Sequence, residues 1–392
     1  GTLALLRLPI DAFPDISTTQ TKIILKAPGM TPEEVEARIV VPIEQELLGI
    51  PNQTILRSMA KYGIADITID FSDSTEIYWA RQQVSERLAA VMADLPDSVS
   101  GGLAPIATPL SDVFMFTLEG PLPLAERRAL IDWVIRPRLR TLEGVADVNA
   151  LGGFVRTFEV EPDMTALVAR ELSLKDLRAA LQANNRGDGA GRVTAGEESL
   201  PIRVDSTVKT LEDIGAIAVK TDRAGVVRVA DVATVQYGTL TRYGAVTRNG
   251  VDEATQGIVI ALRGANARTV VARVRAELDA IAKTLPEGIE IVPFYDRSAL
   301  VDRATGTVAK ALLEAAVLIV ILLVLFLGDL RAAIVVTMAL PLAALATFLV
   351  MEQVGLSANL MSLGGLAVAI GMLVDAAVVV VENVVARLGE PA

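Results

Sequence analysis

Two carboxylates lie in a segment that is otherwise apolar. Asp375 and Glu382 belong to a run that reads Ala-Ile-Gly-Met-Leu-Val-Asp-Ala-Ala-Val-Val-Val-Val-Glu-Asn from position 369. A carboxylate at the centre of a bilayer costs about 2.5–3.5 kcal/mol on insertion scales, so an acid kept there is expected to carry protons or ions. Their spacing of seven residues is about two helical turns, which places both on one helix face. The pattern predicts Asp375 as a proton relay and Glu382 as a secondary site, unless Glu382 lies at the water interface and is solvated there.

The composition differs between the two parts of the chain, because the charged residues are concentrated in the first part and the last part is mostly apolar. Hydrophobic residues make up 52% of the 392 residues, yet 21% are charged. After residue 310, the only basic residues are Arg331 and Arg387. Three membrane helices are expected in this last part, at 311–328, 332–351 and 360–388. The net charge of -11 argues against a nucleic-acid partner.

The ends of these segments predict an orientation. Arg331 lies between the first two segments, and Arg387 lies at the end of the third. Because basic residues are retained in the cytoplasm, residues 11–305 are expected outside the membrane. The short apolar stretch 1–10 does not resemble a signal peptide and is interpreted as the outer end of a membrane helix that begins before this sequence.

The external part contains a repeat. In the first copy, a strand at 21–27 precedes the capping box Thr31-Pro32-Glu33-Glu34 and a helix with a predicted kink at Pro42, and two strands and a second helix follow. In the second copy the predicted elements are strands at 113–118, 146–151 and 155–160, helices at 124–142 and 174–183, and a returning strand at 257–262. This order predicts two split βαβ units of ferredoxin-like type, the second interrupted by a β-rich insertion.

Several motifs resemble one family of membrane transporters. They are Leu8-Pro9-Ile10-Asp11-Ala12-Phe13-Pro14-Asp15, Ala27-Pro28-Gly29-Met30-Thr31-Pro32, Pro42-Ile43-Glu44, Tyr78-Trp79-Ala80-Arg81-Gln82-Gln83-Val84 and Val381-Glu382-Asn383. In this order the chain resembles the N-terminal part of a resistance-nodulation-division (RND) efflux permease of the heavy-metal branch. The resemblance implies an α+β membrane protein, with ferredoxin-like split βαβ porter subdomains outside the membrane and transmembrane α-helices.

The resemblance also implies the division of the chain. The expected parts are the end of a first membrane helix (1–10), a first porter subdomain (11–102), a second porter subdomain in two pieces (103–185 and 242–305) around a docking subdomain (186–241), and the three membrane helices, the last of which carries Asp375.

The third membrane segment refines the branch. Multidrug relatives carry two adjacent Asp, whereas Ala376 follows Asp375 here, and the residues around Asp375 are similar to those of copper(I) and silver(I) exporters. The chain has no Cys and no His, so Met361 and Met372 are the candidate metal ligands through their soft thioether sulfurs. The alternative is that both methionines only fill gaps between packed helices.

The resemblance implies a proton antiporter, not an enzyme, with no cofactor beyond the transported metal ion and the proton motive force. It implies a multi-pass protein of the bacterial inner membrane with a large periplasmic loop, in contact with membrane lipid. The implied partners are two further copies in a homotrimer, a periplasmic adaptor protein, an outer-membrane channel and a Lys on a later helix that would pair with Asp375. Two alternatives stay open, an RND multidrug exporter and a membrane-anchored assembly domain that does not transport.

Overall fold

The computed structural model describes residues 17–185, 187–195, 198–205, 207–222, 225–242, 244–327 and 330–389, together with Ala4, Leu8 and Pro14. These residues form two compact units. The first comprises residues 1–120, 131–150 and 256–392, and the second comprises 121–130 and 151–255. Most of the predicted N-terminal membrane segment, 1–10, falls outside the described residues.

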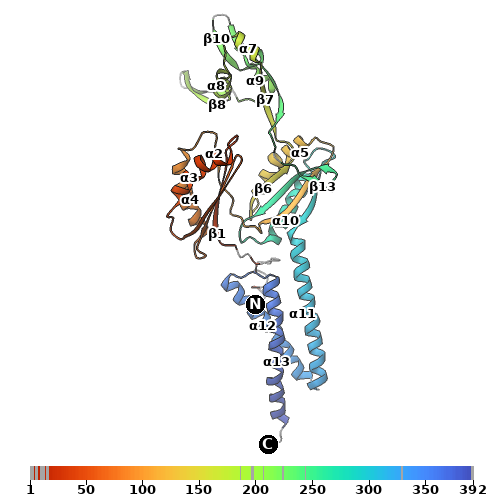
Figure 1. Cartoon of the computed structure of the whole chain (residues 1–392). Coiled ribbons are helices and arrows are strands. Elements are labelled where there is room, and N and C mark those ends of the chain that lie inside the picture. Colours follow the sequence, from red (N-terminus) through yellow and green to blue (C-terminus); the bar gives the residue numbers. More distant parts are fainter. Residues whose placement is uncertain are drawn as a thin grey trace. The chain divides into compact units, whose positions relative to one another are not determined.

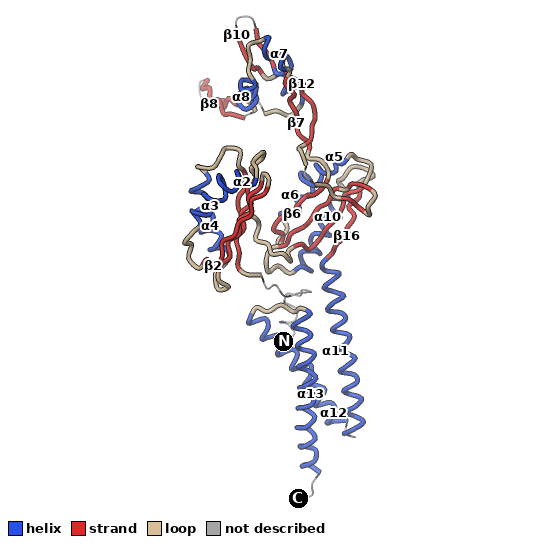
Figure 2. The backbone as a smooth tube through the Cα atoms, in the orientation of Figure 1, coloured by secondary structure: helices blue, strands red, loops and turns tan. Residues whose placement is uncertain are grey.

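The first unit begins with a four-stranded antiparallel sheet in the order β2-β3-β1-β4. Its elements, in chain order, are β1 (Thr19–Lys26), α2 (Pro32–Val35), η1 (Glu36–Val40), α3 (Val41–Leu47), β2 (Gln53–Lys61), β3 (Ile64–Phe71), α4 (Ile77–Met92) and β4 (Ser100–Leu103). The helices cover one face of the sheet (Figures 1 and 2). This is the strand order of a ferredoxin-like fold, so the predicted first copy of the repeat is confirmed.

The core of this sheet follows the predicted apolar stripe. Val35, Ile39, Ile43 and Leu47 are all fully buried and belong to the same cluster as strand residues such as Ile67. At the start of the helical stretch, the Thr31 hydroxyl accepts from the Glu34 N–H at 3.3 Å and the Glu34 carboxylate accepts from the Thr31 N–H at 2.9 Å. The capping box predicted from the sequence is therefore present.

Two helical stretches that contain a proline, one in each copy of the repeat, also contain a π-helical turn. The first is η1 before Pro42, and the second is η2 (Ile131–Ile135) before Pro137, between α5 (Leu124–Leu130) and α6 (Arg136–Arg140). Proline has no N–H and its ring collides with the carbonyl four residues earlier, so the helix widens locally. The kink expected at Pro42 takes this form.

A second four-stranded sheet has the order β16-β5-β15-β6. It is built from β5 (Asp112–Glu119), β6 (Val145–Gly152), β15 (Thr255–Ala261) and β16 (Glu290–Asp296), with α10 (Ala267–Ala282) between the last two strands. The order matches that of the first sheet, so the repeat is real. The strands predicted for this unit are wrong in part. The third strand is β15 and not the segment 155–160, and the returning strand is β16 and not the segment 257–262.

The strand predicted at 155–160 and the helix predicted at 174–183 belong to the second compact unit instead. There, β7 (Arg156–Pro162) pairs with β12 (Ala233–Thr239), and α8 (Leu174–Asn184) packs into a separate apolar core around Leu167 and Ile214. Strand pairing joins residues distant in sequence, and no local pattern specifies which partner a strand takes. In the structure, residues 151–255 belong to this second compact unit.

The second unit is completed by short elements. They are α7 (Met164–Ala169), α9 (Leu211–Ala216), η3 (Val229–Asp231), and three hairpins, which are β8 (Gly187–Ala195) with β9 (Glu198–Asp205), β10 (Ala218–Asp222) with β11 (Gly225–Arg228), and β13 (Thr247–Arg248) with β14 (Asp252–Glu253).

Three long helices end the chain, and they contact one another (Figure 1). They are α11 (Arg297–Leu327), α12 (Leu330–Val354) and α13 (Leu360–Gly389). Within the residues that the structure describes, no helix is long and apolar enough to cross a membrane. The three membrane spans remain a prediction.

Candidate functional site

The helix that carries the candidate residues is held through one face. On α13, Leu366 is buried in a cluster with Phe348 and Met351 of α12 and with Leu8, and Ile370 packs against the same cluster. The helix starts at a tight cap, where the Asn359 side-chain oxygen accepts from the N–H groups of Met361 and Ser362, both at 3.0 Å. Asn359 is itself 6% exposed. The cap and the buried face fix the rotation of α13 about its own axis.

Asp375 follows Leu366 by nine residues, which is two and a half turns, so its position is on the opposite face of α13. The side chains of Asp375 and Glu382 lie outside those that the structure describes. Described residues on the same helix face as Asp375 are exposed, since Val368 is 66% exposed and Val379 is 64% exposed. A Cβ built on Gly364 or Gly371 meets no atom within 4 Å. In the described part of the chain, this face of α13 has room for another helix to approach closely.

The two candidate metal ligands are not brought together. Met361 is 75% exposed and Met372 is 66% exposed. They share a helix face, but eleven residues of α-helix separate them by about 16 Å, so they cannot bind the same ion. Among the described residues, no group of three or more His, Cys, Asp or Glu side chains could hold a metal. A metal role for either methionine needs further ligands from elsewhere.

A polar junction that the sequence analysis missed lies where the second porter sheet continues into α11. Strand β16 ends at Asp296 and α11 starts at Arg297 with no loop between them. Arg297 is 4% exposed and donates to the carbonyl of Leu110. Asp296 pairs with Arg275 of α10, and Arg268 pairs with Asp302 at 2.5 Å. Asp296 followed by Ser298 is a helix N-cap signal that could have indicated this start.

Two carboxyls at the junction have shifted pKa values of opposite sign. Burial raises the pKa of Asp112, and the neighbouring Arg297 offsets part of that rise. Burial also acts to raise the pKa of Asp296, but hydrogen bonds from Ser298 and Arg275 outweigh it and lower the pKa below its ordinary value. The Asp296 carboxylate accepts from the Ser298 N–H at 2.7 Å and from the Ser298 hydroxyl at 2.6 Å. The charge of Asp296 is thus stabilised where the long helix begins.

Two ferredoxin-like porter units, one of them interrupted by an insertion, define the α+β part of an RND-type permease. The sequence model of the AcrB/AcrD/AcrF family matches residues 1–392, and the chain belongs to that family.

Two of the following three relatives are named for metal resistance or cation efflux. The chain is similar to the protein HelA of Legionella pneumophila, with 44% identity over 98% of this chain and 37% of HelA. It is 40% identical to the cobalt-zinc-cadmium resistance protein CzcA of Cupriavidus metallidurans, over 97% of this chain and 37% of that protein. It is 38% identical to the cation efflux system protein CusA of Escherichia coli, over 100% of this chain and 38% of that protein.

A crystal structure described as a heavy metal efflux pump has the same fold. Its crystal form II superimposes with a TM-score of 0.89 at 34% identity, covering 100% of this chain and 39% of that one. The chain therefore spans well under half the length of these relatives. The resemblance to RND permeases of the heavy-metal branch is confirmed, and the metals named in the relatives are mixed.

Proposed function

We propose that this chain supplies the porter and proton-relay part of a proton-driven permease that exports heavy-metal cations. Membership of the family and the names of the relatives support the class of transported substrate. The observation that carries the mechanism is the place of Asp375, an acid in an apolar helix, on the face of α13 opposite the buried Leu366. An acid on an exposed face of a membrane helix can gain and lose a proton as a neighbouring helix moves.

The proposal includes the membrane. The helices α11, α12 and α13 cross the inner membrane and the porter units lie in the periplasm, as the arginine distribution predicts. The protein works as a homotrimer with a periplasmic adaptor and an outer-membrane channel. Proton entry supplies about 2.3 kcal/mol for each proton per 100 mV of membrane potential.

Copper(I) and silver(I) are the proposed cargo. This choice rests on Ala376 and on the residues around Asp375, and it fits a chain in which thioethers are the only soft ligands. The similar identities to CzcA and CusA, 40% and 38%, do not distinguish the metals. Cells that produce the whole protein should gain tolerance to copper or silver before zinc, cobalt or dyes. Tolerance to dyes alone would favour the multidrug alternative.

The mechanism is tested in proteoliposomes of the whole protein, with a metal indicator and an imposed pH gradient. Asp375→Asn keeps the volume of the side chain and removes its titration, so transport should fall to the level of empty vesicles. Glu314→Gln is the matched control, because Glu314 lies in α11, is 69% exposed and already pairs with Lys310 at 3.8 Å. Undiminished, gradient-dependent transport by Asp375→Asn would refute Asp375 as the relay.

A further inference from the structure

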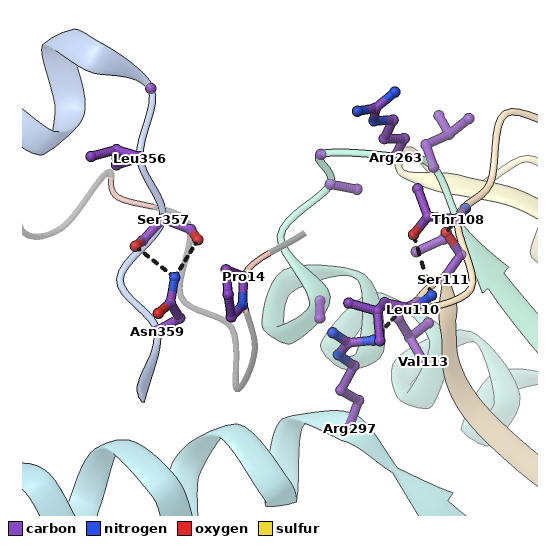
Figure 3. A pocket seen from close by; sticks show the side chains of 16 residues that line it. Pro14, Thr108, Leu110, Ser111, Val113, Arg263, Arg297, Leu356, Ser357 and Asn359 are labelled. Carbon is purple, nitrogen blue, oxygen red and sulfur yellow. Dashed lines mark hydrogen bonds between the residues drawn. The ribbon is translucent and has the colours of Figure 1, made fainter. Parts of the chain in front are cut away.

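A cavity of about 300 Å³ lies within the first compact unit, beside the end of the second porter sheet where β5 begins and β15 and β16 end. Its walls come from the segment before β5, the loop between β15 and α10, the start of α11, and the connection Gly355–Asn359 between α12 and α13. Figure 3 shows Ser357 and Asn359 on one side of it and Thr108, Ser111 and Arg297 on the other. The size lies at the lower end of the range for small-ligand sites.

The cavity lining is cationic. Arg263 and Arg297 both contribute to it, and no Asp or Glu is among the described residues that line it. Arg297 is held by the carbonyl of Leu110, and Arg263 donates to the carbonyls of Ser17 and Thr18, so both guanidinium groups are fixed in place. Asp112, outside the lining, offsets part of the charge of Arg297. Fixed guanidinium groups are the side chains that best recognise phosphate oxygens.

The hydroxyl groups that line the cavity can donate hydrogen bonds to a ligand. The Ser111 hydroxyl oxygen accepts from the Thr108 N–H at 2.8 Å, and the Thr108 hydroxyl accepts from the Leu110 N–H at 3.3 Å. The Ser357 hydroxyl accepts from the Asn359 side-chain amide at 3.1 Å. A hydroxyl that accepts in this way keeps its own proton for a further partner. The N-terminal end of α10, at Ala267, adds positive potential at the wall.

The position of the cavity indicates where such a partner comes from. Helix α12 has 25 residues and leads directly into the connection that lines the cavity. At 1.5 Å per residue a helix of this length measures about 37 Å, which is the hydrocarbon core of a bilayer with part of its headgroup layers. If α12 and α13 cross the membrane as proposed above, the cavity lies at the level of the lipid headgroups on the outer side.

We propose that this cavity binds a phosphate ester, and that its source is the headgroup of a phospholipid in the outer leaflet of the membrane. The two guanidinium groups and the hydroxyl donors hold the phosphate oxygens, while Leu262 and Leu356 contact the glycerol end of the lipid. This inference rests on the membrane topology given in the proposed function. Its ligand, a phospholipid phosphate, is distinct from the metal and the proton of that function.

The test is native mass spectrometry of the full chain released from detergent, titrated with phosphatidylglycerol. Diacylglycerol, which has the same tails without the phosphate, and soluble glycerol 3-phosphate are the two comparison ligands. One phosphatidylglycerol should be retained per chain, and diacylglycerol should not compete. Arg263→Gln and Arg297→Gln should each weaken retention about tenfold, since each removes a hydrogen bond between charged groups. Ser111→Ala, a milder change that leaves Arg297 intact, should weaken retention a few-fold.

The control is Arg303→Gln, because Arg303 is an exposed cation on α11 that does not line the cavity. Equal weakening by Arg303→Gln would show general attraction to anionic lipid and overturn the site, as would equal retention of diacylglycerol. Competition by glycerol 3-phosphate at similar concentrations would support the phosphate site but assign it to a soluble ester. Flotation with vesicles separates the two proposals. A chain that does not float contradicts the membrane topology, whereas a chain that floats without selecting phosphatidylglycerol contradicts this inference alone.

Discussion

Arg275 of α10 pairs with Asp296, the last residue of β16, at the point where the second porter sheet becomes the long helix α11. The same carboxylate caps α11 through Ser298, and Arg275 also lies 5.4 Å from the centre of the Phe114 ring in β5. One ion pair thus connects a helix, two strands of the sheet and the start of α11. No loop separates α11 from the sheet at this point.

Asp296→Asn should lower the stability of the second porter unit by about 1 kcal/mol at neutral pH, because it removes the charge from a helix cap and from the ion pair. The pKa of Asp296 is lowered in the folded state, so its stabilisation is fully present above the unfolded pKa of about 3.9 and is lost as the pH falls through the folded pKa. Thermal unfolding of the full chain in detergent, measured from pH 7 to 3, should show the two proteins converging only below pH 4.

The control for that experiment is Asp94→Asn, an exposed acid after α4, which should not change the unfolding midpoint. A difference between Asp296→Asn and the unmodified chain that persists unchanged at pH 3 would contradict the assigned charge effect.

Ile43→Ala should destabilise the first porter unit by about 2–5 kcal/mol, because it leaves a cavity where a fully buried side chain packs in the core. Val41→Ala, two residues earlier on the exposed side of α3, should cost less than about 1 kcal/mol, since Val41 is 39% exposed. Urea unfolding of both variants measures the difference. Equal costs would mean that the stripe of Val35, Ile39, Ile43 and Leu47 does not form the core as described.

The topology can be tested cleanly because the chain has no cysteine. A cysteine placed at Asp94, in an exposed turn, should react with a membrane-impermeant thiol reagent added to the periplasmic side, while one at Asp329 should not. After the membrane is permeabilised, both should react. Labelling of Asp329→Cys alone in intact cells would reverse the orientation.

Glu382→Gln should reduce transport less than Asp375→Asn. Seven residues nearer the C-terminal end of α13, Glu382 is expected close to the water interface, where holding a charge costs little. The measurement is proton-driven metal transport in proteoliposomes at matched protein levels. A Glu382→Gln protein as inactive as Asp375→Asn would make the two acids a joint relay.

The sequence alone determined much of the local structure. The capping box at Thr31 and the apolar stripe through Ile43 follow from side-chain chemistry and periodicity within about twenty residues. The order of strands and helices along the chain predicted the first ferredoxin-like unit, but only part of the second. The candidate acids were also found this way, because a charge in an apolar run is visible without any tertiary contact. Pro42 signalled a disturbed helix, although only the structure showed that the disturbance is a π-helical turn.

Tertiary structure decided what depends on distant partners. The sequence assigned the strand at Phe158 to the second porter sheet, but β7 pairs with β12. In this pairing, the partners Phe158 and Tyr237 lie 79 positions apart in the sequence. It gave no sign that Arg297 is buried, since a lone Arg before an apolar helix is compatible with full exposure. Strand pairing, the burial of Arg297 and the cationic cavity depend on segments that meet only after folding, because local sequence does not specify which distant partner a strand or side chain takes.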